Sequence, residues 1–143
     1  MDAREFYETI VISTVAEFES EPADRRRAFL ACLTVFHMCD YLEPGRQERR
    51  ELIEALRIEC PQFETVERVA NAFKHTRSSW RSLPVSHVYA RPPAVAGQMQ
   101  AGLSMLGDFD GGVEVWGERD SDIGSALQAV LPVLAARVTA QVP

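Results

Sequence analysis

The chain has 143 residues, of which 46% are hydrophobic and 25% are charged, and its formal net charge is −6 at pH 7. This length fits one domain with a buried core, and the composition excludes a disordered chain. The acidic balance argues against broad, non-specific binding of nucleic acid, which needs a basic surface, and it suits a protein that binds a basic partner.

The apolar runs are short and the acidic N-terminus does not have the pattern of a signal peptide. We therefore expect a cytoplasmic protein with no role for a membrane. Its three cysteines, Cys32, Cys39 and Cys60, are an odd number at no metal-like spacing. We expect them to be reduced and buried.

Apolar side chains recur at helical spacing in the first part of the chain and predict four helices. The first covers residues 3–20, the second residues 24–42, and the third residues 46–58. The fourth begins at Pro61, which is favoured in the first turn of a helix, and runs to about Trp80. Four helices joined by short loops indicate a helical bundle.

The pattern changes after residue 83. The sequence "PVSHVYARPP" (84–93) alternates and predicts a short extended segment or edge strand. The turn "DFDGG" (108–112) precedes the predicted strand "VEVWG" (113–117), so we expect a small hairpin between residues 98 and 117. The carboxylates of the acidic stretch "DFDGGVEVWGERDSD" (108–122) are interpreted as solvated turn residues, since they lack the ligand spacing of a calcium loop.

A last helix is predicted in residues 121–143, with Ser121 as its N-cap and a kink at Pro132. The predicted fold class is therefore mainly α, within a single domain at 1–143. A part resembling a four-helix bundle (1–81) is followed by an extended or hairpin segment (82–120) and the C-terminal helix.

The fourth predicted helix contains "RVANAFKHTR", in which Arg68, Asn71 and His75 fall within about 60° of one another at about 100° per residue. The apolar residues predicted to face the core lie on the opposite side: Phe63, Val66, Ala70, Phe73 and Trp80. We therefore expect the three polar residues to share a face that is exposed or lies at an interface.

Lys74 and Arg77 add positive charge beside this face, which makes a local basic island in an acidic protein. Such an island would attract a phosphate, so both residues are candidate binding residues. The alternative interpretation is an ordinary polar surface, because any helix face in contact with water has to be polar.

An arginine followed seven residues later by a histidine, in a small helical bundle, resembles the signature of the HEPN superfamily over residues 1–81. The resemblance implies a metal-independent endoribonuclease of toxin or defence type, whose Arg–His face meets its copy across a homodimer. Arg68 and His75 would then be the catalytic pair, and Asn71 the accompanying polar residue. Histidine can transfer protons near neutral pH, and arginine can hold a phosphate.

His37 and Asp40 lie three residues apart and near the apolar stripe of the second helix. They indicate either a carboxylate-oriented histidine, as in a base or a metal ligand, or a buried hydrogen-bonded pair that fixes helix packing. We favour the structural pair, because a metal site needs more ligands. We therefore expect no metal and no cofactor.

Two classes of function remain. The first is a small acidic interaction protein without catalysis, such as a phage or mobile-element factor that binds a larger basic protein partner. The alternative is the HEPN-like endoribonuclease, acting on RNA as a homodimer. The acidic balance, the small size and the predicted hairpin favour the first.

Overall fold

The computed structural model describes residues 1–74, 83–98, 100–101, 108–116 and 122–141. The described part is mainly helical and contains one two-stranded antiparallel sheet and a C-terminal helix. This arrangement confirms the predicted fold class.

The first predicted helix consists of three segments without a break: α1 (Ala3–Phe6), a π-helical turn η1 (Tyr7–Val11) and α2 (Ile12–Ser20). Asp2 caps its start, because its carboxylate accepts a hydrogen bond from the backbone N–H of Glu5 at 2.8 Å. The hydroxyl of Tyr7, in the π-helical turn, donates to the carbonyl of Leu131 at 3.2 Å. This hydrogen bond connects the first continuous helix, α1 to α2, to the last helix of the chain.

The next three helices are α3 (Arg25–Leu42), α4 (Arg46–Glu59) and α5 (Phe63–Lys74). They confirm the second and third predicted helices to within a residue at each end. Pro61 lies in the turn before α5 rather than in its first turn, since the N–H of Phe63 bonds to the carbonyl of Cys60 there. Residues 75–80, the predicted end of the fourth helix, lie outside the described part of the chain.

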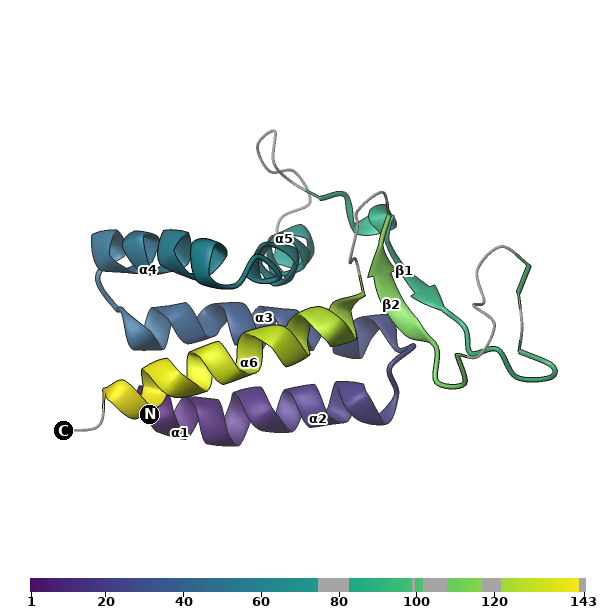
Figure 1. Ribbon diagram of the computed structural model, residues 1–143, viewed down its shortest axis with the longest axis horizontal. Helices are drawn as coiled ribbons and strands as arrows, with labels where there is room; N and C mark the ends of the chain where they lie inside the picture. Colours follow the sequence, from purple (N-terminus) through teal and green to yellow (C-terminus); the bar gives the residue numbers. More distant parts are fainter. Residues whose placement is uncertain (75–82, 99, 102–107, 117–121, 142–143) are drawn as a thin grey trace.

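The helices are stacked in the order α1–α2, α3 with α6 (Ile123–Ala140), and α4 with α5 (Figure 1). Their facing sides form one continuous core. Its largest fully buried side chains are Phe18, Phe63, Met38, Leu56, Ile123, Leu127 and Leu134. Both termini lie at one end of this stack and the strands at the other (Figure 1).

The strands are β1 (Val88–Arg91) and β2 (Gly112–Val115), preceded by the 3-10 turn η2 (Val85–His87). They pair antiparallel, with Val88 opposite Val115 and Arg91 opposite Gly112. The prediction of a hairpin confined to residues 98–117 was wrong, because the partner of the second strand is the earlier extended segment. Val88, Val113 and Val115 are buried and anchor this small sheet to the core.

The cap of α6 is Asp122, whose carboxylate accepts from the backbone N–H of Ser125 at 2.7 Å; the predicted cap, Ser121, lies outside the described residues. The helix continues through Pro132 to Ala140. By length and composition alone this described helix could cross a membrane, as could the core helix of a soluble protein. Its buried side chains, among them Leu127 and Leu134, belong to the core.

Candidate functional site: an acidic groove between the sheet and the helices

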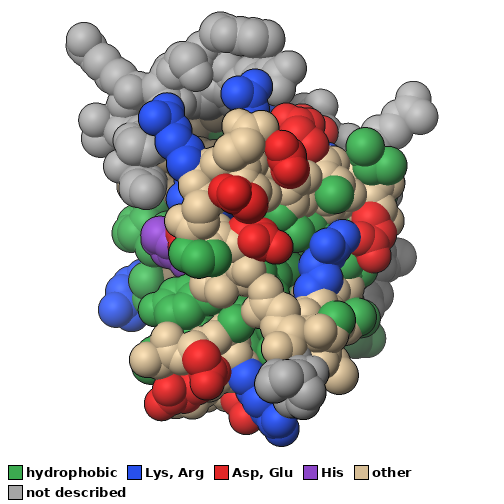
Figure 2. Space-filling model, turned by 90° about the vertical axis from the view of Figure 1, so that its left-hand side faces the viewer, with side chains coloured by type: hydrophobic (Ala, Val, Ile, Leu, Met, Phe, Trp, Pro, Cys, Tyr) green, Lys and Arg blue, Asp and Glu red, His purple; other side chains and the backbone are tan. Residues whose placement is uncertain are grey.

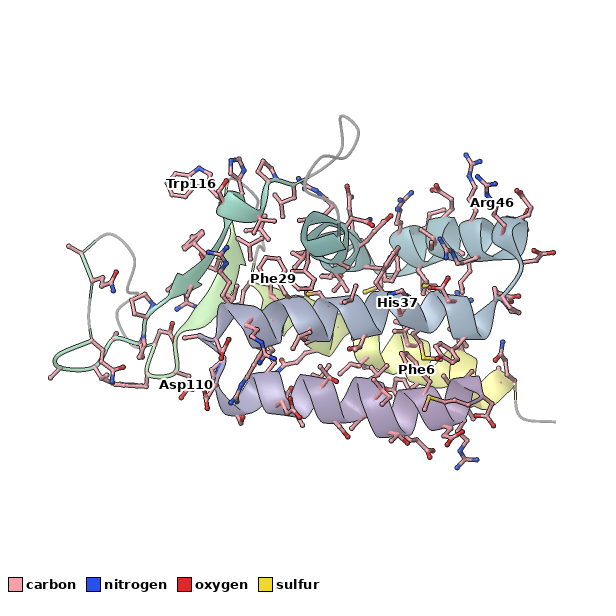
Figure 3. All side chains as sticks on the ribbon, turned by 180° about the vertical axis from the view of Figure 1, so that it is seen from behind. Phe6, Phe29, His37, Arg46, Asp110 and Trp116 are labelled. Atoms are coloured by element: carbon pink, nitrogen blue, oxygen red, sulfur yellow. The ribbon has the colours of Figure 1, made fainter. Side chains whose placement is uncertain are left out.

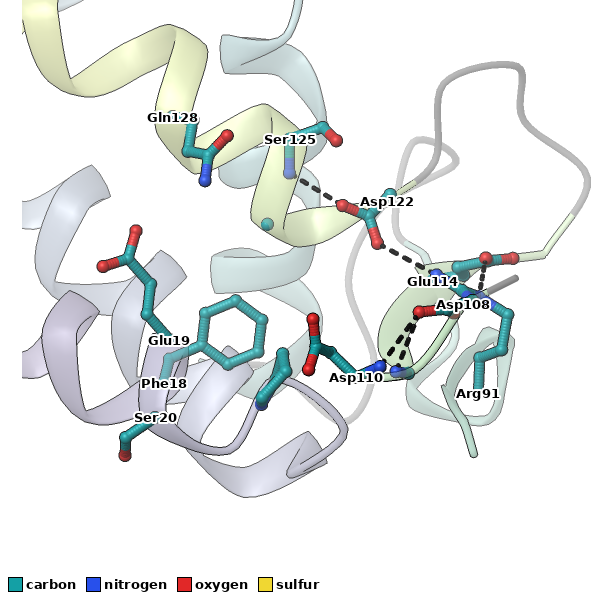
Figure 4. Close-up of a pocket in the computed structure, with 13 residues that line it drawn as sticks. Phe18, Glu19, Ser20, Arg91, Asp108, Asp110, Glu114, Asp122, Ser125 and Gln128 are labelled. Carbon is teal, nitrogen blue, oxygen red and sulfur yellow. Dashed lines mark hydrogen bonds and ion pairs between the residues drawn. The ribbon is translucent and has the colours of Figure 1, made fainter. Parts of the chain in front are cut away.

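A groove of about 960 Å³ opens where the end of α2 and the start of α6 meet the two-stranded sheet (Figure 4). Three segments far apart in the sequence form it. Its charged and polar lining consists of Glu19, Ser20, Arg91, Asp108, Asp110, Glu114, Asp122, Ser125 and Gln128. The lining thus has five carboxylates and one guanidinium, which gives the groove an excess of negative charge.

Arg91 is the centre of this site and is only 9% exposed. Its Nη1 forms an ion pair with Asp108, its Nε donates to Glu114, and its Nη2 lies 3.7 Å from Asp122. A buried guanidinium needs such partners, because an unpaired charge away from water is costly. The cluster therefore joins β1, β2, the preceding loop and the N-terminus of α6.

The sequence-based interpretation of these acidic residues as solvated was wrong for three of them. Asp108, Glu114 and Asp122 are each less than 36% exposed at the side chain and face Arg91. The signal that was missed is Arg91 itself, the only arginine or lysine in the segment "PVSHVYARPP". A buried arginine on a strand needs carboxylate partners to offset the loss of hydration, and the acidic stretch at 108–122 provides three.

Glu19 and Asp110 have a different environment. Within the described part of the chain, neither carboxylate has an ion-pair or hydrogen-bond partner, and both residues are exposed. Glu19 extends from the last turn of α2, and Asp110 lies across the groove on the turn before β2 (Figure 4). Two unneutralised charges therefore face the groove from opposite sides.

The sheet and the turn before it also carry exposed aromatic side chains. Phe109, beside Asp110, is 71% exposed, and Trp116, just after β2, is 66% exposed and packs edge-on against Tyr89 with ring centroids 6.0 Å apart (Figure 3). The hydroxyl of Tyr89 donates to Glu114 at 2.7 Å. This hydrogen bond, together with burial, raises the pKa of Tyr89. Glu114 thereby connects the aromatic pair to the Arg91 cluster.

The polar face of α5 is only partly described. Arg68 and Asn71 are both half-buried on this helix, whereas His75 and Arg77 lie outside the described residues. Lys74 ends α5, and its side chain is likewise outside the description. The expected Arg–His pair is therefore untested, because one of its members lies outside the described residues, and the HEPN-like assignment stays a prediction.

His37 and Asp40 form a hydrogen bond of 2.9 Å between Nδ1 and Oδ2. Because a carboxylate only accepts, Nδ1 carries the proton. Asp40 also accepts from Arg49 of α4. The side chains of His37 and Asp40 are 41% and 36% exposed, so the pair lies at the surface and not in the core as expected.

The burial of the cysteines and the placement of possible metal ligands bear on two further expectations. Cys32, Cys39 and Cys60 are buried and free, and burial raises the pKa of Cys39 to about 12. Among the described residues, no three His, Cys, Asp or Glu side chains are placed to hold a metal ion. In the acidic groove, the carboxylates closest together already share Arg91.

The chain matches no protein-family model, no curated protein sequence and no solved structure.

Proposed function

We propose that this protein is a non-catalytic interaction protein whose acidic groove binds a basic segment of a protein partner. The observation that carries the proposal is the pair of carboxylates of Glu19 and Asp110, which lie on opposite sides of the groove and have no partner among the described residues. Lysine and arginine side chains are the protein groups that complement such charges.

The rest of the groove supports a binding role. Its volume of about 960 Å³ falls in the range of ligand pockets, so it can admit several side chains of an extended segment. Arg91 and its three carboxylates hold the walls together without contributing an uncompensated positive charge. Phe109, which lies between the lining residues Asp108 and Asp110 in the sequence, has an exposed ring that can give apolar contact to the aliphatic part of a lysine or arginine.

The negative net charge of the chain also favours binding of a basic partner. At −6 it attracts a basic partner over a distance of roughly one Debye length, about 8–10 Å at physiological salt. Such attraction accelerates encounter, while the groove supplies the specific contacts. Binding should therefore weaken as salt is raised.

Isothermal titration calorimetry with a short peptide rich in arginine and lysine tests the proposal. The Glu19→Gln/Asp110→Asn variant should bind the peptide at least tenfold more weakly than the wild type. The Glu43→Gln/Glu64→Gln variant removes the same charge at two positions outside the groove and should bind as the wild type does. Equal weakening in both variants would mean that only net charge matters, and the proposal would be wrong.

A further inference from the structure

A second groove, of about 570 Å³, lies along α4, toward the end of the bundle opposite the sheet. Its lining is rich in arginine: Arg46, Gln47, Arg49, Arg50, Ile53, Glu54, Arg57 and, from α5, Glu67. At about 100° per residue, the four arginines fall within about 100° on one side of α4. Figure 2, which faces this end, shows basic side chains over α4 with acidic ones beside them.

Two of the four arginines are held by carboxylates. Arg57 is bound bidentately by Glu67, at 2.9 Å from Nε and 2.8 Å from Nη2, and its Nη1 donates to Glu54 at 2.7 Å. Arg49 donates to Asp40. These pairs fix the wall of the groove and neutralise the charges of Arg49 and Arg57.

Arg46 and Arg50 have no such partners within the described residues. Both are exposed, one helical turn apart, and Arg46 points away from the bundle (Figure 3). Like charges at this spacing destabilise a helix slightly. An anion seated between the two guanidinium groups would remove that repulsion.

We propose that the α4 groove binds a small ligand through a phosphomonoester group, held by Arg46 and Arg50. A phosphomonoester carries up to two negative charges and three acceptor oxygens, so one group can serve two guanidinium forks at once. A single carboxylate group has one charge and two oxygens, so it can bind only one guanidinium group bidentately. The groove is much larger than a phosphate, which leaves room for the rest of a ligand beside Ile53 and Gln47.

This site is independent of the acidic groove, because it lies on other helices and has charge of the opposite sign. Calorimetric titration of the full chain with four compounds at one ionic strength tests it: inorganic phosphate, adenosine 5′-monophosphate, adenosine and acetate. Phosphate and the nucleotide should bind, the nucleotide with a submillimolar Kd, whereas adenosine and acetate should bind at least tenfold more weakly than the nucleotide. Binding of adenosine or acetate as tight as that of the nucleotide would overturn the proposal, and so would the absence of phosphate binding.

The Arg46→Gln/Arg50→Gln variant should bind the nucleotide at least tenfold more weakly, with an unchanged circular dichroism spectrum and a melting temperature equal to or slightly above that of the wild type. The matched control is Arg25→Gln/Arg26→Gln, which removes two exposed arginines at the far end of α3. The control should bind as the wild type does. Equal losses in the two variants would show a general charge effect and would contradict a site on α4.

Discussion

Arg91 of β1 lies 3.7 Å from Asp122, the residue that caps α6, measured from Nη2 to Oδ2. The other carboxylate oxygen of Asp122 accepts from the N–H of Ser125 at 2.7 Å. One side chain therefore both begins the last helix and joins it to the sheet. The shape of the acidic groove depends on this link, because its walls are the sheet on one side and α6 on the other.

Replacing Arg91 by methionine should lower the free energy of unfolding by about 3–5 kcal/mol, since it leaves three carboxylates together without their counter-charge. Urea denaturation followed by circular dichroism measures this. The double variant Arg91→Met/Glu114→Gln should recover part of the loss, because it removes one of the repelling charges. A single variant as stable as the wild type would show that the cluster does not hold the sheet in place.

Gly111 forms the floor of the groove at a φ of +73°, and a Cβ added there would lie 2.5 Å from the backbone oxygen of Arg91. The variant Gly111→Ala should therefore lose about 1–3 kcal/mol of stability. Gly97 is the matched control, because its φ is +83° but a Cβ would meet nothing within 4 Å. Thermal melting should show a larger loss for Gly111→Ala, and equal losses would mean that the close approach to Arg91 is relieved at no cost.

The triad of His37, Asp40 and Arg49 should contribute little stability despite its short contacts. Burial alone would raise the pKa of Asp40, but hydrogen bonds from His37 and Arg49 and the charge of Arg49 together lower it below its ordinary value. Because the side chains are more than a third exposed, the variant Asp40→Asn should lose about 1 kcal/mol or less at pH 7.

The pH dependence of that loss follows from the lowered pKa. The ionised form of Asp40 stabilises the fold above the ordinary aspartate pKa of about 3.9, and this contribution disappears as the pH falls through the lower pKa of the folded state. The difference between wild type and Asp40→Asn in urea melts should thus shrink as the pH falls below about 4. A difference that grows below that pH would contradict this account.

The interaction proposal predicts that the wild type does not cleave RNA. Incubation of a labelled single-stranded RNA with the purified chain, with and without EDTA, measures this. Arg68→Ala and His75→Ala variants should be indistinguishable from the wild type. Cleavage that persists in EDTA and is lost in both variants would instead support the HEPN-like alternative.

The helices could be predicted from the sequence because their signals are local. Periodic apolar residues act within a few turns, and α3 and α4 follow them closely. Which residues of α5 face the core was less well predicted. Phe73, expected in the core, is 49% exposed and stacks on Phe29, whereas Val69 and Ala72 are buried in the core. Tertiary packing, and not the size of the side chain, decided which residues are buried.

The site could not be predicted in the same way. The pairing of β1 with β2 joins segments that residues 92–111 separate in the sequence, and nothing local in either segment specifies the partner. The charges of Asp108 and Asp122 look alike in the sequence to that of Asp110, yet only the first two lie close enough to Arg91 to form ion pairs among the described residues. Long-range geometry separates the structural carboxylates from the free ones.

Chemical-shift mapping of the 15N-labelled protein with the arginine- and lysine-rich peptide tests the central claim most directly. The account predicts that the largest shifts fall on the backbone amides of residues that line the acidic groove: Ser20, Asp110, Gly111, Ser125 and Gln128. The same amides should stay unshifted with a peptide in which glutamine replaces every basic residue. Shifts spread evenly over acidic surfaces such as the face of α5 at Glu64, or no shifts in the groove, would contradict it.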